Sequence, residues 1–286
     1  MALKDKKVLV AGAGKSGIGS VNLLLKAGAD VVLTDGNKDL DPEALYQKIY
    51  QETKIPLILG EVNEEQVKEF DLLVLSPGIS VNAPIACLFA DQGKPVWSEI
   101  ELAYQAGKGK IAAITGTNGK TTTTALTGEI MKGYYDSTFV VGNIGTPYTS
   151  VALDTKEDSR IVAEISSFQL ETIVDFCPDV CAVLNITPDH LDRHGTVEVY
   201  AKTKESIGKN QRPDQVMVLN YEDKTTREMA DRAKGRVVFF SLHHKAEEGV
   251  YMEGDRFIIE DDGTKTEVCT LEDTCLLGDH NYENIL

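Results

Sequence analysis

Short, continuously apolar runs alternate with helical stretches along this chain, and the alternation constrains its fold more than any other feature. The first four runs are residues 8–11, 31–34, 55–59 and 72–75, and a helical stretch from about 18 to 26 follows the first of them. A strand that is apolar on both faces is typical of a buried parallel sheet, and the helices between such strands form its crossovers. The pattern therefore predicts a parallel α/β sheet.

A second series of the same kind begins at Lys110. Its later apolar runs are 139–141, 160–163, 182–186 and 216–219. Two series predict two α/β domains, 1–97 and 98–286, with the boundary near Trp97. The stretch from 237 to 269 differs, because turn residues such as Glu253-Gly254-Asp255 split it into short alternating runs. We expect small antiparallel hairpins there.

The second series opens with a strand, a glycine-rich turn and a helix. The string is Ile111-Ala-Ala-Ile-Thr-Gly-Thr-Asn-Gly-Lys-Thr-Thr122. In this arrangement backbone N–H groups and a helix N-terminus face a nucleotide phosphate, a lysine reaches the outer phosphates, and a hydroxyl binds Mg²⁺. Ile114 stands where the general pattern has a further glycine. The structural alternative is an ordinary strand-to-helix turn with a surface lysine.

The first series carries a signal of its own. Gly12-Ala-Gly14-Lys-Ser-Gly17 follows a strand and opens a helix, and Asp35 ends the next strand. These are the elements of a dinucleotide fingerprint, which indicates a ligand with a diphosphate. Alone, the fingerprint would favour an NAD-dependent oxidoreductase. Alternatively, the glycines only let the helix and strand pack closely.

Further polar side chains follow strands of the second series. Glu164 comes after the run 160–163, and Asp189 and His190 come after 182–186. The carboxyl ends of the strands are where open α/β sheets bind ligands, and Mg²⁺ in phosphoryl transfer takes oxygen ligands. We therefore expect metal ligation here, although a lone carboxylate at a strand end is more commonly a cap or a surface charge. A P-loop NTPase acting as a switch or motor is a second alternative, with Glu164 as its acid.

Together the motifs predict an α/β protein in which a Rossmann-like N-terminal parallel-sheet domain precedes a P-loop-type α/β ATP-binding domain with a small antiparallel hairpin region. The net charge of −16, from 29 basic and 45 acidic residues, argues against nucleic acid as a partner. No apolar run is long enough to span a bilayer. Five cysteines without a C-x-x-C pair are typical of reduced thiols, so we expect a cytoplasmic protein.

Residues 116–121 resemble the phosphate loop of the Mur ligases, the ATP-dependent amide-forming enzymes of bacterial peptidoglycan synthesis. Further strings that resemble this family follow in its order and cover nearly the whole chain: Ser76-Pro-Gly-Ile79, Gly142-Asn-Ile-Gly145, Glu164-Ile-Ser-Ser-Phe-Gln-Leu-Glu171, Asn185-Ile-Thr-Pro-Asp-His-Leu-Asp-Arg193 and Gly278-Asp-His-Asn-Tyr-Glu-Asn284. A folate-modifying glutamate ligase is the nearest enzyme alternative, but it gives no reason for the Gly12-Ala-Gly14 domain.

The resemblance implies a reaction that joins D-glutamate to UDP-N-acetylmuramoyl-L-alanine at the cost of ATP, through an acyl phosphate. It implies a uridine diphosphate pocket, so that the fingerprint binds a UDP-sugar instead of NAD. The residues implied to line this pocket are Gly14, Lys15, Ser16, Asp35 and Gly78. Asn143 is implied to reach the diphosphate or sugar, and Ser166 and Gln169 to place the muramoyl-alanine arm.

The resemblance also implies the ATP site. Its residues are Gly116, Thr117, Asn118, Gly119, Lys120, Thr121 and Thr122, with Asn281 and Asn284 toward adenine and Asn284 the stronger candidate. Thr121 and Glu164 are implied to hold one Mg²⁺, and His190 a second. Lys120, His190 and Lys204 are implied to be catalytic.

Lys204 matches the lysine that family members carry as a carbamate, a CO₂-derived anion that suits a Mg²⁺ site. Only a neutral amine can attack CO₂, and an unperturbed lysine is charged up to a pKa near 10.4. Without the resemblance, a lysine on a helix is a solvated charge. Lys202 is the neighbour that could be confused with it, and the spacing from Tyr200 favours Lys204.

Family members have a third, glutamate-binding domain after the string that ends at Asn284. We therefore expect this chain to hold the first domain and most of the second, to be a monomer, and to be inactive or weakly active alone. A UDP-sugar-binding module is how such a fragment would behave.

Overall fold

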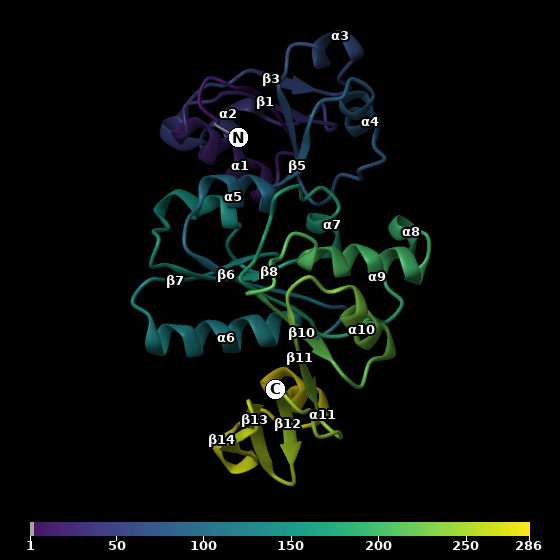
Figure 1. Ribbon diagram of the computed structural model, residues 1–286. Helices are drawn as coiled ribbons and strands as arrows, with labels where there is room; N and C mark the ends of the chain where they lie inside the picture. Colours follow the sequence, from purple (N-terminus) through teal and green to yellow (C-terminus); the bar gives the residue numbers. More distant parts are fainter. Residues whose placement is uncertain (1–2) are drawn as a thin grey trace. The chain divides into compact units, whose positions relative to one another are not determined.

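The computed structural model describes residues 3–286, which form two compact units, each made of segments that are not continuous in sequence (Figure 1). The first unit joins the residues up to Gly109 to two later segments, Val141–Glu157 and Phe168–Phe176. The second unit consists of Lys110–Val140, Asp158–Ser167 and Cys177–Leu286.

The first unit is built on a five-stranded parallel sheet with the order β3-β2-β1-β4-β5. The strands are β1 (Lys7–Ala11), β2 (Asp30–Asp35), β3 (Leu57–Leu59), β4 (Leu72–Leu75) and β5 (Val96–Ser98). The chain moves outward from β1 in one direction to β3 and then in the other to β5. A ligand-binding crevice is expected where this direction reverses, beyond the carboxyl ends of β1 and β4.

Helices cover this sheet and close its core. They are α1 (Lys15–Lys26), α2 (Pro42–Tyr46), α3 (Glu64–Val67), α4 (Pro84–Asp91) and α5 (Glu99–Ala106), with 3₁₀ turns at Tyr50–Glu52, Tyr148–Ser150 and Ala152–Asp154. Leu9 and Leu73 from the sheet pack with Phe70 and Phe89 in the buried core. α1 begins three residues before the predicted start, because Gly14 is an extended N-cap and the helix starts immediately after it.

The later segment Phe168–Phe176 is held to this unit by a buried glutamate of α5. The carboxylate of Glu101 accepts hydrogen bonds from the backbone N–H groups of Val174 (2.8 Å), Asp175 (3.1 Å) and Phe176 (3.0 Å). Glu101 is fully buried, and a buried carboxylate needs such donors. The unit is therefore assembled from residues far apart in the chain.

The second unit is built on a nine-stranded sheet with the order β14-β13-β12-β11-β10-β9-β6-β8-β7. The strands are β6 (Lys110–Thr115), β7 (Thr138–Gly142), β8 (Arg160–Glu164), β9 (Val180–Val183), β10 (Val216–Asn220), β11 (Arg236–Ser241), β12 (Gly249–Glu253), β13 (Arg256–Asp261) and β14 (Thr264–Thr270). The pairs from β8 through β12 are parallel, and β12/β13 and β13/β14 are antiparallel.

The helices of this unit are α6 (Lys120–Tyr134), α8 (Leu191–His194), α9 (Val197–Glu205), α10 (Lys224–Met229) and α11 (Asp279–Ile285), with 3₁₀ turns at Ser206–Gly208, Ala230–Arg232 and Leu271–Asp273. The short α7 (Ser167–Leu170) crosses from one unit to the other. α6 lies along β6 and β8 (Figure 1). Ile114, Val162, Leu184 and Phe240 form the core beneath it.

The predicted fold class is confirmed: both units are α/β, with parallel strands and an antiparallel region at one end of the second sheet. In the second unit, two details of the prediction are wrong. β11 pairs in parallel with both β10 and β12, so the antiparallel region begins only at the β12/β13 pair. The run predicted as a strand through Ile186 ends at Val183, because the following residues turn to hold a neighbouring loop. No helix within residues 3–286 is long and apolar enough to cross a bilayer.

Candidate functional site

The glycine-rich turn of the second unit has a backbone that only glycine adopts readily. β6 ends at Thr115 and α6 begins at Lys120, while Gly116 and Gly119 have φ angles of +152° and +84°. A Cβ at Gly119 would collide with Oδ1 of Asn284, and one at Gly116 would lie 3.0 Å from Cβ of Leu184. The turn is thus a tight loop between a buried strand and a helix N-terminus, as a phosphate-binding loop requires.

Asn185 holds this loop in place. Its backbone carbonyl accepts from the N–H of Thr117 (2.9 Å), its side-chain oxygen accepts from the N–H of Asn118 (2.8 Å), and its amide nitrogen donates to the Asn118 carbonyl (3.1 Å). Sequence analysis assigned no role to Asn185. The sequence feature that could have indicated this role is the position of Asn185 just after β9, the strand that pairs with β6.

Two lysines meet beneath the loop. Nζ of Lys120 donates to the carbonyls of Gly116 (3.0 Å) and Thr117 (2.8 Å), and Nζ of Lys204 donates to the same Gly116 carbonyl at 2.7 Å. Lys204 is 1% exposed, whereas Lys202, two residues away on α9, is exposed. Burial, reinforced by the charge of Lys120, lowers the pKa of Lys204 to about 7. Burial also lowers the pKa of Lys120, against the attraction of Glu164 and Asp189.

Hydroxyl and carboxylate oxygens lie beside these lysines. Thr121, in the first turn of α6, donates to Oε2 of Glu164 at 2.8 Å, and Glu164 is the buried last residue of β8. Thr122 follows in the same turn and is half-buried. Thr117 contacts the hydroxyl of Tyr200 at 3.3 Å, a second contact that sequence analysis did not assign. This end of the sheet therefore gathers two amino groups, a hydroxyl and a carboxylate around one loop.

His190 lies before α8 with a left-handed backbone (φ +50°), and its imidazole Nε2 is 3.6 Å from the Asp189 carboxylate. Within residues 3–286 no three His, Cys, Asp or Glu side chains gather closely enough to hold a metal ion by themselves. The nearby oxygens of Thr121 and Glu164 are the donors that Mg²⁺ prefers, and Mg²⁺ commonly completes its shell with water and nucleotide phosphates. The donor set fits that ion.

The two asparagines of the last predicted string have different surroundings. Oδ1 of Asn284, on α11, accepts from the hydroxyl of Thr123 in α6 at 3.1 Å and lies against Gly119. The amide of Asn281 donates to the carbonyl of Leu277 at 2.8 Å and so braces the turn that precedes α11. Asn284 therefore contacts the start of α6, and Asn281 stabilises the turn before α11.

The glycine fingerprint of the first unit forms a second tight turn. Gly12 has φ of +98°, and an added Cβ would lie 2.7 Å from Oγ of Ser76; an added Cβ on Gly17 would collide with the Gly12 carbonyl. Asp35 holds the turn, because its carboxylate accepts from the N–H of Ala13 (2.8 Å) and of Asn37 (2.9 Å). In this structure Asp35 therefore supports the turn through the backbone.

The other residues predicted for this turn lie around it. Gly14 and Lys15 are exposed at the start of α1, Ser16 is half-buried beside them, and Gly78 is exposed in the turn after β4. A cavity of about 390 Å³ opens at the carboxyl ends of β1, β2 and β3. Its lining residues are Ala11, Thr34, Asp35, Gly36, Gly60, Glu61, Val62, Ile79, Pro84 and Ile85. The cavity combines apolar walls with the Asp35 turn, at the edge where such sheets bind ligands.

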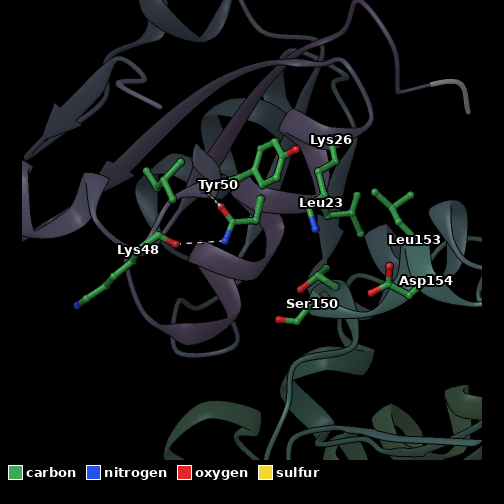
Figure 2. Close-up of a pocket in the computed structure, with 10 residues that line it drawn as sticks. Leu23, Lys26, Lys48, Tyr50, Ser150, Leu153 and Asp154 are labelled. Carbon is green, nitrogen blue, oxygen red and sulfur yellow. Dashed lines mark hydrogen bonds between the residues drawn. The ribbon is translucent and has the colours of Figure 1, made fainter. Parts of the chain in front are cut away.

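A smaller cavity of about 170 Å³ in the same unit has a different lining (Figure 2). Figure 2 shows Leu23 and Lys26 of α1 facing Leu153 and Asp154. Nζ of Lys26 lies 5.2 Å from the ring centre of Tyr50. None of the predicted site residues lines it. We assign it no role.

The residues predicted for the substrate arm are divided between the units. Asn143 is exposed after β7 and belongs to the first unit, as does Gln169, which is 1% exposed and donates from Nε2 to Glu99 at 3.3 Å. Ser166 is half-buried and belongs to the second unit. Sequence analysis did not identify Glu99 as a partner of Gln169.

Comparison with known proteins places these motifs in a family. Residues 114–286 match the model of the Mur ligase middle domain, and residues 6–98 match the Mur ligase MurD-like N-terminal domain. The chain is 52% identical to UDP-N-acetylmuramoylalanine–D-glutamate ligase of Lachnospira eligens and 47% identical to the protein of that name in Lachnoclostridium phytofermentans. Each match covers this whole chain and 63% of the relative's length.

Solved structures show the same fold. UDP-N-acetylmuramate:L-alanyl-γ-D-glutamyl-meso-diaminopimelate ligase from Neisseria meningitides superposes with a TM-score of 0.60 at 18% identity, over 98% of this chain and 90% of that one. UDP-N-acetylmuramate-alanine ligase from Thermotoga maritima superposes with a TM-score of 0.52 at 22% identity, and the match covers 98% of this chain and 63% of that one. Family models match both parts of the sequence, and a relative is 52% identical over the whole of this chain. The chain therefore belongs to the Mur ligase family.

Proposed function

We propose that this chain is part of an ATP-dependent ligase that joins D-glutamate to UDP-N-acetylmuramoyl-L-alanine during synthesis of the bacterial peptidoglycan precursor. The names of the relatives at 52% and 47% identity support this substrate pair. The observation that carries the proposal is a phosphate loop with Lys120, Thr121 and Glu164 in a chain that also carries the Gly12 fingerprint turn. We place the reaction in the cytoplasm and expect the protein to act as a monomer.

We propose that residues 1–97 bind the UDP substrate and that 98–286 bind ATP; the separate family matches at 6–98 and 114–286 support this division. The cavity beside Asp35 would take uridine, and the backbone near Gly14, Lys15, Ser16 and Gly78 would face the diphosphate. Asn143, Ser166 and Gln169 would contact the rest of the substrate.

The proposed reaction has two steps. A carboxylate oxygen of the alanine residue attacks the γ-phosphorus of ATP, which forms an acyl phosphate and releases ADP. The amine of D-glutamate then attacks the acyl carbon, loses a proton and expels inorganic phosphate, which leaves the new amide. No protein nucleophile is needed, so the work of Lys120 is to hold the phosphates and neutralise their charge.

We propose that Thr121, Glu164, His190 and carbamylated Lys204 hold two Mg²⁺ ions. When bound, Mg²⁺ would neutralise charge on the transferring phosphate. Lys204 suits carbamylation because its pKa of about 7 leaves much of the amine uncharged near neutral pH. Nuclear magnetic resonance with ¹³C-bicarbonate tests this: a carbamate signal is expected in wild type and absent in K204Q, with K202Q as the matched control that keeps it. A signal lost in K202Q and kept in K204Q would overturn the assignment.

Calorimetry tests the proposed function. We expect UDP-N-acetylmuramoyl-L-alanine to bind with a dissociation constant in the micromolar range; a constant of about 1 µM corresponds to a binding free energy of about −8 kcal/mol. We expect no binding of NAD⁺. The matches give no support to the alternative of an NAD-dependent oxidoreductase. Binding of NAD⁺ without binding of the UDP substrate would overturn the proposal.

A further inference from the structure

Glu99, the first residue of α5, has a carboxylate that is buried and surrounded by hydrogen-bond donors. It accepts from the backbone N–H of Thr149 (2.8 Å), from the Thr149 hydroxyl (2.9 Å) and from Nε2 of Gln169 (3.3 Å). The backbone of Tyr148 also donates to it. Glu99 is 1% exposed, and all these groups belong to the first unit.

This environment matches an ionised carboxylate. Burial raises the pKa of Glu99, and the Thr149, Gln169 and Tyr148 donors act in the opposite direction. An ionised carboxylate only accepts hydrogen bonds, whereas a carboxylic acid would bring a proton that needs an acceptor. The groups that contact Glu99 supply donors, so the geometry suits the charged form, which Glu99 takes at pH values above its raised pKa.

The charged form has a consequence for Gln169. A side-chain amide has one donor end and one acceptor end, and a carboxylate can pair only with the donor end. Glu99 thereby fixes the orientation of the amide, with the NH₂ group toward α5 and the carbonyl oxygen directed elsewhere.

We propose that Glu99 is a positioning residue for substrate recognition: it holds Gln169 so that the acceptor end of the amide meets a donor, an N–H or hydroxyl, of the muramoyl-alanine arm. The inference rests on the proposed function, in which Gln169 contacts that arm. Glu99 itself does not touch the substrate.

Glu101 is a matched control on the same helix. It is also fully buried and also accepts several hydrogen bonds, but its partners are the backbone of residues 174–176 and the side chain of Gln105. None of these partners is proposed to contact substrate. A general loss of stability in α5 should therefore affect E101Q and E99Q alike, while an effect through Gln169 should be confined to E99Q.

The test is calorimetry of the full chain with UDP-N-acetylmuramoyl-L-alanine and with UDP alone. In E99Q we expect about tenfold weaker binding of the complete substrate and unchanged binding of UDP, which lacks the arm. E101Q should bind both as wild type does. In a Q169A background, adding E99Q should cause no further loss, because Glu99 acts through Gln169.

Circular dichroism establishes that each variant is folded. If E99Q does not fold, E99D keeps the charge but shortens the side chain by one methylene, and the same tenfold loss confined to the complete substrate is expected. Wild-type affinity in the folded variant, or an additive loss in the Q169A background, would overturn the inference alone. A wild-type chain that binds neither UDP nor the complete substrate would overturn the proposed function and this inference with it.

Discussion

At the scale of single residues, Lys120 and Lys204 bring two amino groups to the Gly116 carbonyl. We expect K120M to weaken ATP binding by about 2–3 kcal/mol, the contribution of hydrogen bonds to a charged group, or roughly 30- to 150-fold. K132M is the matched control, because Lys132 lies in the last turn of the same helix and pairs with Glu129 at the surface. Calorimetry with ATP and Mg²⁺ measures both. Equal affinities in K120M and K132M would contradict the prediction.

The raised pKa of Glu99 leads us to expect that the stability of the chain depends on pH. Burial raises its pKa in the folded chain, so its contribution is fully present below the unfolded pKa near 4.5 and is lost as the pH rises through the folded value. The free energy of unfolding of wild type relative to E99Q should therefore fall above pH 4.5, by at most about 1.4 kcal/mol per pH unit. Urea denaturation measures it. A difference that rises with pH would refute the sign.

At the scale of elements, the loop before α6 depends on a left-handed glycine. In G119A the φ of +84° and the collision with Asn284 should lower the free energy of unfolding by at least about 1–2 kcal/mol. G133A lies in the same helix with no atom near its added Cβ, and should gain up to roughly 0.5–1 kcal/mol. Chemical denaturation of both variants tests the pair. A G119A protein as stable as G133A would show that the loop tolerates a Cβ.

Element boundaries were predictable wherever an apolar run was followed by a turn. β4 matches its predicted bounds, and β1, β2 and β10 extend the predicted runs by one or two residues. The end of β9 was not predictable, because the backbone beyond Val183 pairs with the phosphate loop and that pairing leaves no apolar signal in the sequence. β5 was missed since three residues are too few for a period. The parallel pairing of β11 was not predictable because parallel and antiparallel partners leave the same pattern in a single strand.

At the scale of the whole molecule, the first unit needs segments that follow Gly109. A fragment of residues 1–109 lacks the Thr149 and Gln169 donors of Glu99 and the backbone donors of Glu101 on residues 174–176, and losing the partners of a buried carboxylate costs about 1–3 kcal/mol. Trp97 is the only tryptophan of the chain and lies 4% exposed in β5, so its fluorescence reports on this unit. We expect the fragment to unfold at lower urea than the full chain. Coincident Trp97 transitions would show that the later segments add no stability.

Which segments of the chain make up each unit could not be predicted from the sequence. Strand periodicity and glycine motifs indicated the α/β class and a site with Lys120, Thr121 and Glu164, whereas Lys204 was assigned to that site only through the family resemblance. The contacts of Glu99 with residues 50 and 70 positions away carry no periodic signal, because a buried carboxylate on a helix looks like a surface charge in sequence. Only the folded structure distinguishes a buried carboxylate such as Glu99 from a carboxylate at the surface.

Because the first unit is made of segments that are far apart in sequence, it cannot complete its folding until the last of them has been synthesised. Its sheet is complete in sequence by Ser98, but the last donors to the α5 carboxylates are on residues 174–176. At about 5–20 residues per second, a ribosome needs roughly 4–14 s to make the ~70 residues between Gly109 and Phe176. Until the end of that interval Glu99 lacks its Gln169 donor and Glu101 lacks its donors on residues 174–176. Water must therefore replace these donors around α5 until the later segments of the unit have been made.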